Sequence, residues 1–233
     1  MKKPCLSFKD LPASSTPDRS MNTGTYGCPI SSMISATYTP TSQEAPLQFY
    51  PGASQIREPD KDTRGAFDDN KPLGITLHYT ASKSTSGTIR ALAESGLKYH
   101  ALISEDGRLI QTASLWHKTW HAGKAEWNGN SPNQTHWGIG VLNWGRLDDR
   151  SRAWPGNVVP TDQTRYRNGF LWEKATEAQE ACLMLFIRWA VSRGIDPAQI
   201  CGHDECCIPP GRKTDPGGIF SFSMDELRNH FLD

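Results

Sequence analysis

Two histidines in this sequence of 233 residues lie in local contexts suited to metal or acid–base chemistry. His78 stands in the run Ile75-Thr-Leu-His-Tyr79, which is apolar and β-branched and therefore predicts a buried strand. A neutral imidazole buried there needs a hydrogen-bond partner or a metal ion. From the residues alone, His78 is either a core histidine bonded to a backbone carbonyl or part of a site.

His203 begins a loop, Gly202 to Gly217, that also contains cysteine, carboxylate and lysine side chains. Zinc prefers such groups, and a catalytic zinc site takes three protein ligands with an open fourth position. Two histidines and an aspartate would serve, but two of the ligands must come from distant segments. The spacing alone is therefore a weak signal.

The elements around these residues predict a mixed α/β fold, with a central β-sheet flanked by helices. The expected strands and hairpin cover 74–79, 99–111 with a turn at Asp106-Gly107, 137–142 and 200–202. A helix is expected over 86–95, where Ile89, Leu92 and Ala93 share one face. The polar segment 146–171 is interrupted by Gly and Pro, which predicts a surface excursion.

Two further helices are expected near the C-terminus. The capping box Thr176-Glu-Ala-Gln179 begins the longer one, and Gly194 ends it. Its core face is predicted from residues that recur at helical spacing: Ala178, Cys182, Leu185, Phe186 and Trp189. A second box, Ser223-Met-Asp-Glu226, caps a short final helix.

The composition of the chain limits the classes of function that it can have. With 25 basic and 25 acidic residues, the formal net charge is +0, which argues against nucleic acid as a partner. We expect no membrane insertion, because no uncharged apolar run approaches the ~20 residues of a membrane span. The N-terminus lacks the apolar core of a cleavable signal, so we expect synthesis in the cytoplasm. Six cysteines are too few for a disulfide scaffold, and the redox compartment stays open.

The composition and periodicity of the sequence change near residue 65. Residues 1–65 are rich in Ser, Thr and Pro and lack periodicity, which predicts an irregular N-terminal arm before a single domain over 66–233. The arm is either a disordered leader or a segment that packs on the domain or carries a delivery or partner signal.

Five pieces of the sequence, in order, resemble the zinc-dependent N-acetylmuramoyl-L-alanine amidases, the superfamily that includes phage amidases, muropeptide-recycling amidases and peptidoglycan recognition proteins. The most specific piece joins Gly202-His-Asp-Glu to Pro210-Gly-Arg-Lys-Thr-Asp-Pro-Gly217. The other four are Leu77-His-Tyr-Thr-Ala81, the hairpin from Tyr99, Trp120-His-Ala-Gly123 and Gly138-Ile-Gly-Val141.

The resemblance implies a set of site residues. His78, His203 and Asp215 match the ligands of one Zn²⁺ ion, and Lys213 and Tyr99 match catalytic residues beside it. His121 matches a substrate-contacting histidine of the cleft, and Trp120 beside it is a candidate to stack on substrate. The implied reaction is hydrolysis, by zinc-activated water, of the amide between N-acetylmuramic acid and the L-alanine of the stem peptide.

Two departures affect this assignment. Leu142 stands where recycling amidases carry a catalytic glutamate, which favours the tyrosine-using branch of the family. Phage-type members use a cysteine as third ligand, so Cys206 and Cys207 are alternatives to Asp215. We prefer Asp215, because it lies in the matching Lys-Thr-Asp-Pro piece.

The remaining candidates have structural interpretations. His100 is expected on the strand face opposite Tyr99, and Asp204 and Glu205 are expected to hold the loop or orient a ligand. Surface positions are expected for His117, His136 and His230, and a core position for Cys182.

The expected role is a peptidoglycan hydrolase that lyses cell walls, as an endolysin or an injected antibacterial effector released by a non-classical route. Its partners would be peptidoglycan or muropeptides and an immunity or inhibitor protein. The alternatives are a cytoplasmic muropeptide-recycling amidase and a peptidoglycan-binding protein without catalysis. An unrelated zinc peptidase is disfavoured, because the sequence has no His-Glu-x-x-His motif.

Overall fold

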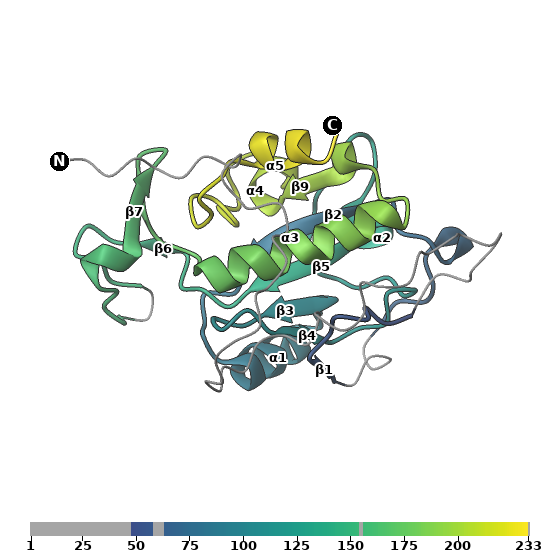
Figure 1. The fold of residues 1–233 in the computed structure, drawn as a ribbon, viewed down its shortest axis with the longest axis horizontal. Helices are drawn as coiled ribbons and strands as arrows, with labels where there is room; N and C mark the ends of the chain where they lie inside the picture. The colour runs from purple at the N-terminus through teal and green to yellow at the C-terminus, as the bar shows by residue number, and fades with distance from the viewer. Residues whose placement is uncertain (1–47, 58–62, 154–155, 233) are drawn as a thin grey trace, which may run out of the picture. The chain divides into compact units, whose positions relative to one another are not determined.

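The computed structural model describes residues 48–57, 63–153 and 156–232. They form the predicted mixed α/β fold, built on a six-stranded sheet of order β1-β4-β3-β5-β2-β9 (Figure 1). Most of the predicted arm lies outside the described residues. Its described part includes β1 (Gln55–Ile56), which pairs with β4, and Tyr50, whose ring contacts Phe186 of the domain.

The centre of the sheet is the parallel pair β2 (Gly74–Tyr79) and β5 (His136–Val141). Both strands match the expected segments to within one residue at each end. Side chains alternate along a strand, so Ile75 and its neighbour Trp137 face one side while His78 and Gly140 face the other. The predicted hairpin is also present as β3 (Ala101–Ile103) and β4 (Leu109–Gln111).

Helix α3 (Glu177–Ser192) covers one face of the sheet, and the predicted capping box of Thr176 and Gln179 begins it (Figure 1). The predicted core face is partly wrong. Phe186 is buried, but Leu185 is 42% exposed and Cys182 is half-buried rather than in the core. The residues in contact with the core lie one position further along: Gln179, Leu183, Ile187 and Ala190. Apolar side chains occur on most sides of this helix, so its packing against the sheet, and not the periodicity of the sequence, determines which side is buried.

Helix α1 (Thr85–Glu94) packs near β3 on the opposite side from α3. The helix begins one residue before the expected start, with the Ser84 hydroxyl as its cap, and Gly96 ends it with a φ of +66°. Ile89 and Leu92 pack on the sheet as expected, whereas Ala93 is exposed.

The segment predicted as a surface excursion forms a second, three-stranded sheet. Its strands are β6 (Arg146–Leu147), β7 (Thr164–Arg167) and β8 (Phe170–Glu173), in the order β6-β8-β7. Short strands interrupted by turns carry too little periodicity to be predicted. A small cluster of Leu147, Ala153 and Val159 supports this sheet.

The C-terminal region adds β9 (Ile200–Gly202), the one-turn helix α4 (His203–Cys206) and α5 (Met224–His230), which the predicted Ser223 box caps. The shorter elements are α2 (Pro132–Thr135) and three 3-10 turns, η2 (Asp68–Asn70), η3 (Thr161–Gln163) and η4 (Pro197–Gln199). None of the described helices combines the length and apolar character that crossing a bilayer requires.

Candidate metal centre

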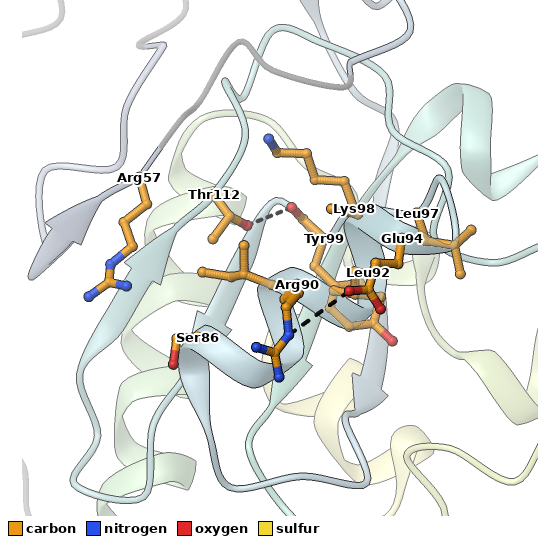
Figure 2. A pocket seen from close by; sticks show the side chains of 11 residues that line it. Arg57, Ser86, Arg90, Leu92, Glu94, Leu97, Lys98, Tyr99 and Thr112 are labelled. Carbon is orange, nitrogen blue, oxygen red and sulfur yellow. Dashed lines mark hydrogen bonds and ion pairs between the residues drawn. The ribbon is translucent and has the colours of Figure 1, made fainter.

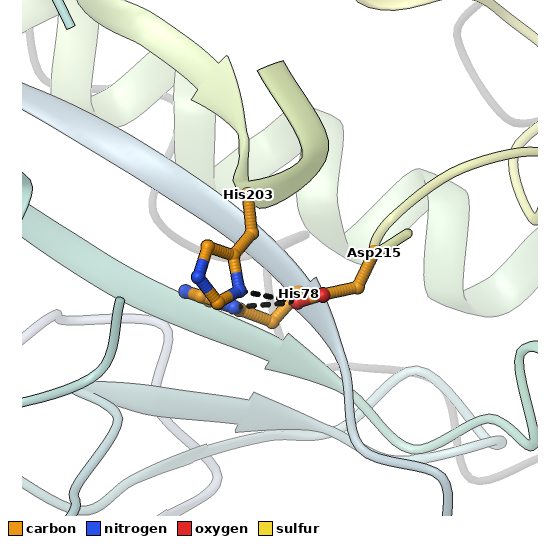
Figure 3. A group of neighbouring side chains, drawn as sticks. All are labelled: His78, His203 and Asp215. Carbon is orange, nitrogen blue, oxygen red and sulfur yellow. Dashed lines mark hydrogen bonds and ion pairs between the residues drawn. The ribbon is translucent and has the colours of Figure 1, made fainter. Parts of the chain in front are cut away.

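Three side chains from two distant parts of the chain meet at the carboxyl ends of β2 and β9. Leu77 and Gly202 are partners in the parallel register, so His78 and His203, the residues that follow them, lie side by side. The loop after α4 returns Asp215 to both. Its Oδ2 lies 2.8 Å from Nδ1 of His78 and 2.9 Å from Nδ1 of His203 (Figure 3). The structure therefore brings together the three predicted ligands.

Burial shapes the charges of this cluster. Burial lowers the pKa of His78 to about 4, although Asp215 partly offsets it, so the ring is neutral at pH 7. A carboxylate oxygen of Asp215 thus stands between two imidazole nitrogens.

These donors fit a zinc ion. Nε2 of His203 lies 2.8 Å from the Ala122 carbonyl, which can only accept, so this nitrogen carries the hydrogen. In a neutral ring, Nδ1 then presents a lone pair toward the carboxylate. A bound cation, or an added proton, is needed between such acceptors, and two imidazole nitrogens with a carboxylate oxygen are a zinc donor set. All three ligand atoms lie within 4.8 Å of one another.

The alternative third ligands lie elsewhere. Cys206 is buried with Cys201, Ala122 and Ala125, and its thiol contacts the His203 carbonyl. The Cys207 thiol lies near the carbonyls of Asp204 and Pro209. Among the described residues, the grouping that could hold a metal ion consists of His78, His203 and Asp215.

The two predicted catalytic side chains flank the cluster in different ways. Tyr99 is buried, with its ring centroid 4.7 Å from that of His78. Burial raises the pKa of Tyr99 far above its ordinary value, so the phenol keeps its proton. Lys213 is exposed on the loop two residues before Asp215, and its positive charge contributes to the lowered pKa of His78.

Glycines on β5 make room for the rings around His78. A Cβ at Gly138 would lie 2.5 Å from the His121 ring, and one at Gly140 would lie 2.7 Å from the Tyr99 ring. The Gly-Ile-Gly-Val pattern therefore follows from the packing on the two faces of β5. Its apolar side chains face α3, and its glycines face the candidate site.

The two predicted substrate-binding residues differ in exposure. Trp120 is 38% exposed, and the Arg64 guanidinium lies 6.0 Å from its ring. His121 is only 4% exposed, and both of its ring nitrogens face protein atoms. Contact of either residue with substrate stays a prediction.

A pocket of about 510 Å³ lies beside α1 (Figure 2). Tyr99 lines this pocket, and its ring also contacts His78. The remaining lining combines apolar residues of α1 with Arg57, Lys98 and the ion pair of Arg90 with Glu94.

Leu142 is buried against Tyr99 and Leu102, so this position adds no carboxylate to the site. Of the neighbouring acids, Glu205 bonds the Gly202 amide at 2.8 Å and Arg228, which holds the loop as expected. The Asp204 amide donates to the Asp215 carbonyl at 2.7 Å, and burial raises the pKa of the Asp204 carboxyl to about 7.

The expectation of three surface histidines is correct for His230 and wrong for His136, which is fully buried. His136 begins the central strand β5, where neighbouring strands enclose it. His117 is half-buried. His100 is a satisfied core residue: its Nδ1 accepts from the Gly138 amide and its Nε2 lies 2.8 Å from the His117 carbonyl.

Two supporting residues were missed by the sequence analysis. Asn133 is 1% exposed and binds the backbone of the 121–123 segment. Trp172 lies so close to Gly217 and Gly218 that a Cβ at either would collide with its ring, and it thereby supports the loop that carries Asp215. No local pattern marks either residue, because both act across long sequence separations.

Comparison with known proteins supplies the family. A family profile described as N-acetylmuramoyl-L-alanine amidase matches residues 68–218, more than half of the chain. The chain belongs to this amidase family. The predicted resemblance is therefore confirmed at the level of the family. A search of curated proteins gave no match.

Solved amidase structures share the fold. AmpDh3 from Pseudomonas aeruginosa, in complex with anhydromuramic pentapeptide, is 22% identical with a TM-score of 0.52, over 68% of this chain and 59% of that one. AmiD from E. coli, in complex with a substrate, is 22% identical with a TM-score of 0.52, over 70% of this chain and 58% of that one. The chain thus spans less than two thirds of either protein.

A third amidase structure is covered almost completely. The endolysin LysCS from Clostridium intestinale is 18% identical with a TM-score of 0.50, over 77% of this chain and 97% of that one. At these identities the three likenesses concern the fold.

Proposed function

We propose that this protein is a zinc-dependent amidase that hydrolyses the amide between the lactyl group of N-acetylmuramic acid and the L-alanine of the stem peptide. The observation that carries the proposal is the convergence of His78, His203 and Asp215 within a chain of the amidase family. The ligands of the AmpDh3 and AmiD complexes, an anhydromuramic pentapeptide and an anhydro-N-acetylmuramic acid peptide, contain the same sugar–peptide junction.

His78, His203 and Asp215 would hold the zinc ion through two Nδ1 atoms and one carboxylate oxygen. When bound, zinc would polarise the amide carbonyl and activate the attacking water. Lys213, exposed on the loop two residues before Asp215, would stabilise the negative charge that develops on the carbonyl oxygen. Tyr99 stays a protonated phenol, able to orient the water or pass a proton to the departing amine.

The surroundings suit a muropeptide. The exposed ring of Trp120 can stack on a sugar face. Beyond the ion pair of Arg90 with Glu94, Arg57 and Lys98 place positive charge around the pocket that Tyr99 lines, which suits the carboxylates of a stem peptide. These contacts support the substrate class proposed here.

We favour action on intact cell walls, as an endolysin or injected effector, over recycling of soluble fragments. The support is the Ser-, Thr- and Pro-rich region before the matched residues 68–218, for which a compact recycling enzyme has little use. Expression directed to the periplasm should then lyse cells, whereas cytoplasmic expression should not. Harmless periplasmic expression of active enzyme would contradict this role. An immunity or inhibitor protein stays a prediction.

The central test is mass spectrometry of purified sacculi and of soluble muropeptides after incubation with the protein. We expect free stem peptides to be released, and the release to stop with a chelator and in His203→Ala. His230→Ala, which changes an exposed histidine away from the site, should retain cleavage. Preference for sacculi supports lysis, and preference for soluble fragments supports recycling. Retained binding without cleavage by the zinc-loaded protein would instead identify a recognition protein.

A further inference from the structure

The hydrogen bonds of His121 determine which of its ring nitrogens carries a hydrogen. Its Nε2 lies 3.3 Å from the Pro132 carbonyl and 3.2 Å from the His136 carbonyl. Carbonyl oxygens only accept, so Nε2 must donate. In the neutral ring that burial imposes, Nδ1 of His121 is therefore an acceptor.

This acceptor faces His78. Nδ1 of His121 lies 3.1 Å from Nε2 of His78, so Nε2 of His78 must supply the hydrogen. The other nitrogen of His78, Nδ1, then has a free lone pair, and it points at Asp215 from 2.8 Å. One buried histidine thus sets the tautomer of another.

The same short segment also acts on His203. The Ala122 carbonyl, next to His121 in sequence, lies 2.8 Å from Nε2 of His203 and leaves Nδ1 of that ring facing Asp215. His121 and Ala122 therefore orient both imidazoles in the same sense, with each Nδ1 toward the candidate metal position.

Asn133 holds this segment in place. Its Oδ1 accepts hydrogen bonds from the amides of His121, at 2.9 Å, and Ala122, at 2.8 Å, and its Nδ2 donates to the Gly123 carbonyl at 2.6 Å. Gly138 also lies so close that an added Cβ would stand 2.5 Å from the His121 ring. The ring therefore packs directly on the backbone of β5.

We propose that His121, held by Asn133, is a positioning residue that fixes His78 in the Nε2–H tautomer and so directs its Nδ1 lone pair to the metal. The inference rests on the metal site of the proposed function. In this proposal His121 lies behind the candidate ligand His78 and positions it, in place of the substrate contact that the family resemblance implies. Residues behind metal ligands typically change metal affinity by about 10- to 100-fold when lost.

The first test needs no variant and no metal. In metal-free protein with ¹⁵N-labelled histidine, the two-bond proton–nitrogen correlations of each ring identify its tautomer. We expect His78 to show hydrogen on Nε2 and His121 to show hydrogen on Nε2. An Nδ1–H tautomer of His78 in the wild-type protein would overturn the proposal.

The second test compares His121→Leu with His121→Asn by zinc competition against a chromophoric chelator. Asparagine places an oxygen where Nδ1 of His121 stands and keeps the acceptor, whereas leucine removes it. We expect His121→Leu to weaken zinc binding by about 10- to 100-fold and to give mixed tautomers at His78, while His121→Asn keeps most of the affinity.

The matched control is His136→Leu, which changes another buried histidine whose ring makes no contact with the three ligands among the described residues. It should leave zinc affinity and the His78 tautomer unchanged. Equal affinities and tautomers in wild type and His121→Leu would refute the inference. Failure of the wild type to bind zinc would instead refute the metal site, while the tautomer of the metal-free protein still decides the role of His121.

Discussion

The two ends of the β2–β5 pair each bury a histidine, and the two rings have different surroundings. His78 lies near the carboxyl end of β2 opposite Gly140, and His136 begins β5 opposite Gly74. Both are fully buried, and burial lowers the pKa of each ring to about 4. The Nδ1 of His78 faces a carboxylate, whereas the Nδ1 of His136 faces the Thr135 hydroxyl at 2.8 Å.

Burial and a lowered pKa therefore do not distinguish a site from a structural histidine. The distinguishing feature is convergence: at His78, acceptors from three segments point at one position, as a cation requires. At His136, the ring faces the Thr135 hydroxyl and the Gln199 backbone, and no charged group points at it among the described residues. Convergence on one position therefore marks the carboxyl end of the pair and not the amino end.

The largest effect that we expect in this comparison is on catalysis at the carboxyl end. Tyr99→Phe keeps the ring that packs on His78 and removes the hydroxyl. General acid–base assistance is worth about 100-fold or more, so kcat should fall by about that factor while zinc affinity is unchanged. Steady-state kinetics on a defined muropeptide, with zinc content measured in parallel, would check this.

Tyr79→Phe is the matched control for Tyr99→Phe. It removes a neighbouring hydroxyl, which bonds the Thr214 hydroxyl at 3.0 Å. We expect a much smaller loss of kcat. If both variants lost activity equally, the hydroxyl of Tyr99 would have no special part in the reaction.

The two ends of the strand pair also show which features of the fold and the site can be predicted from the sequence. The strands at His78 and Trp137 and the helix caps at Thr176 and Ser223 were predictable, because β-branched runs and capping boxes are local signals. The ligand set came from motifs of the family rather than from spacing, since His78 and Asp215 are far apart in sequence.

Other features were not accessible from local pattern. Whether a histidine at a strand end is buried depends on which strands flank it, so His136 was misplaced on the surface. The buried side of α3 and the β6-β8-β7 sheet depend in the same way on tertiary contacts. The inward ring of His121 follows from Gly138 and Asn133, which only the folded chain brings beside it.

Alanine substitutions at the two glycines that pair with these histidines, Gly74 and Gly140, should have effects of intermediate size. At Gly74, a Cβ would stand 2.1 Å from the Gln199 carbonyl and 2.6 Å from the His136 ring. Overpacking of this kind costs about 1–3 kcal/mol, and a rigid carbonyl favours the upper part of that range. Gly74→Ala should therefore lower the free energy of unfolding by about 2–3 kcal/mol and leave the zinc affinity of the folded protein unchanged.

Gly140→Ala is the counterpart at the site. There the added Cβ meets the Tyr99 and Leu102 side chains, at 2.7 and 3.0 Å, which can shift more readily than backbone. We expect a smaller loss of stability and a measurable loss of kcat. Urea unfolding and kinetics of both variants would check the contrast, and a loss of kcat in folded Gly74→Ala as large as in Gly140→Ala would contradict it.

The smallest effect concerns the pH dependence of stability at the amino end. The pKa of His136 is about 4 in the folded protein, against the ordinary histidine value of 6.5 once the chain unfolds. Between these values the unfolded chain binds more protons, so stability is full above pH 6.5 and is lost as pH falls toward 4. From about pH 6.5 to about pH 5, the loss from this ring is about 2 kcal/mol.

His136→Gln cannot titrate, so its urea midpoint in metal-free buffer should decline less steeply over this range. Parallel declines for wild type and His136→Gln would mean that His136 does not resist protonation, and that the two ends of the strand pair differ in more than convergence.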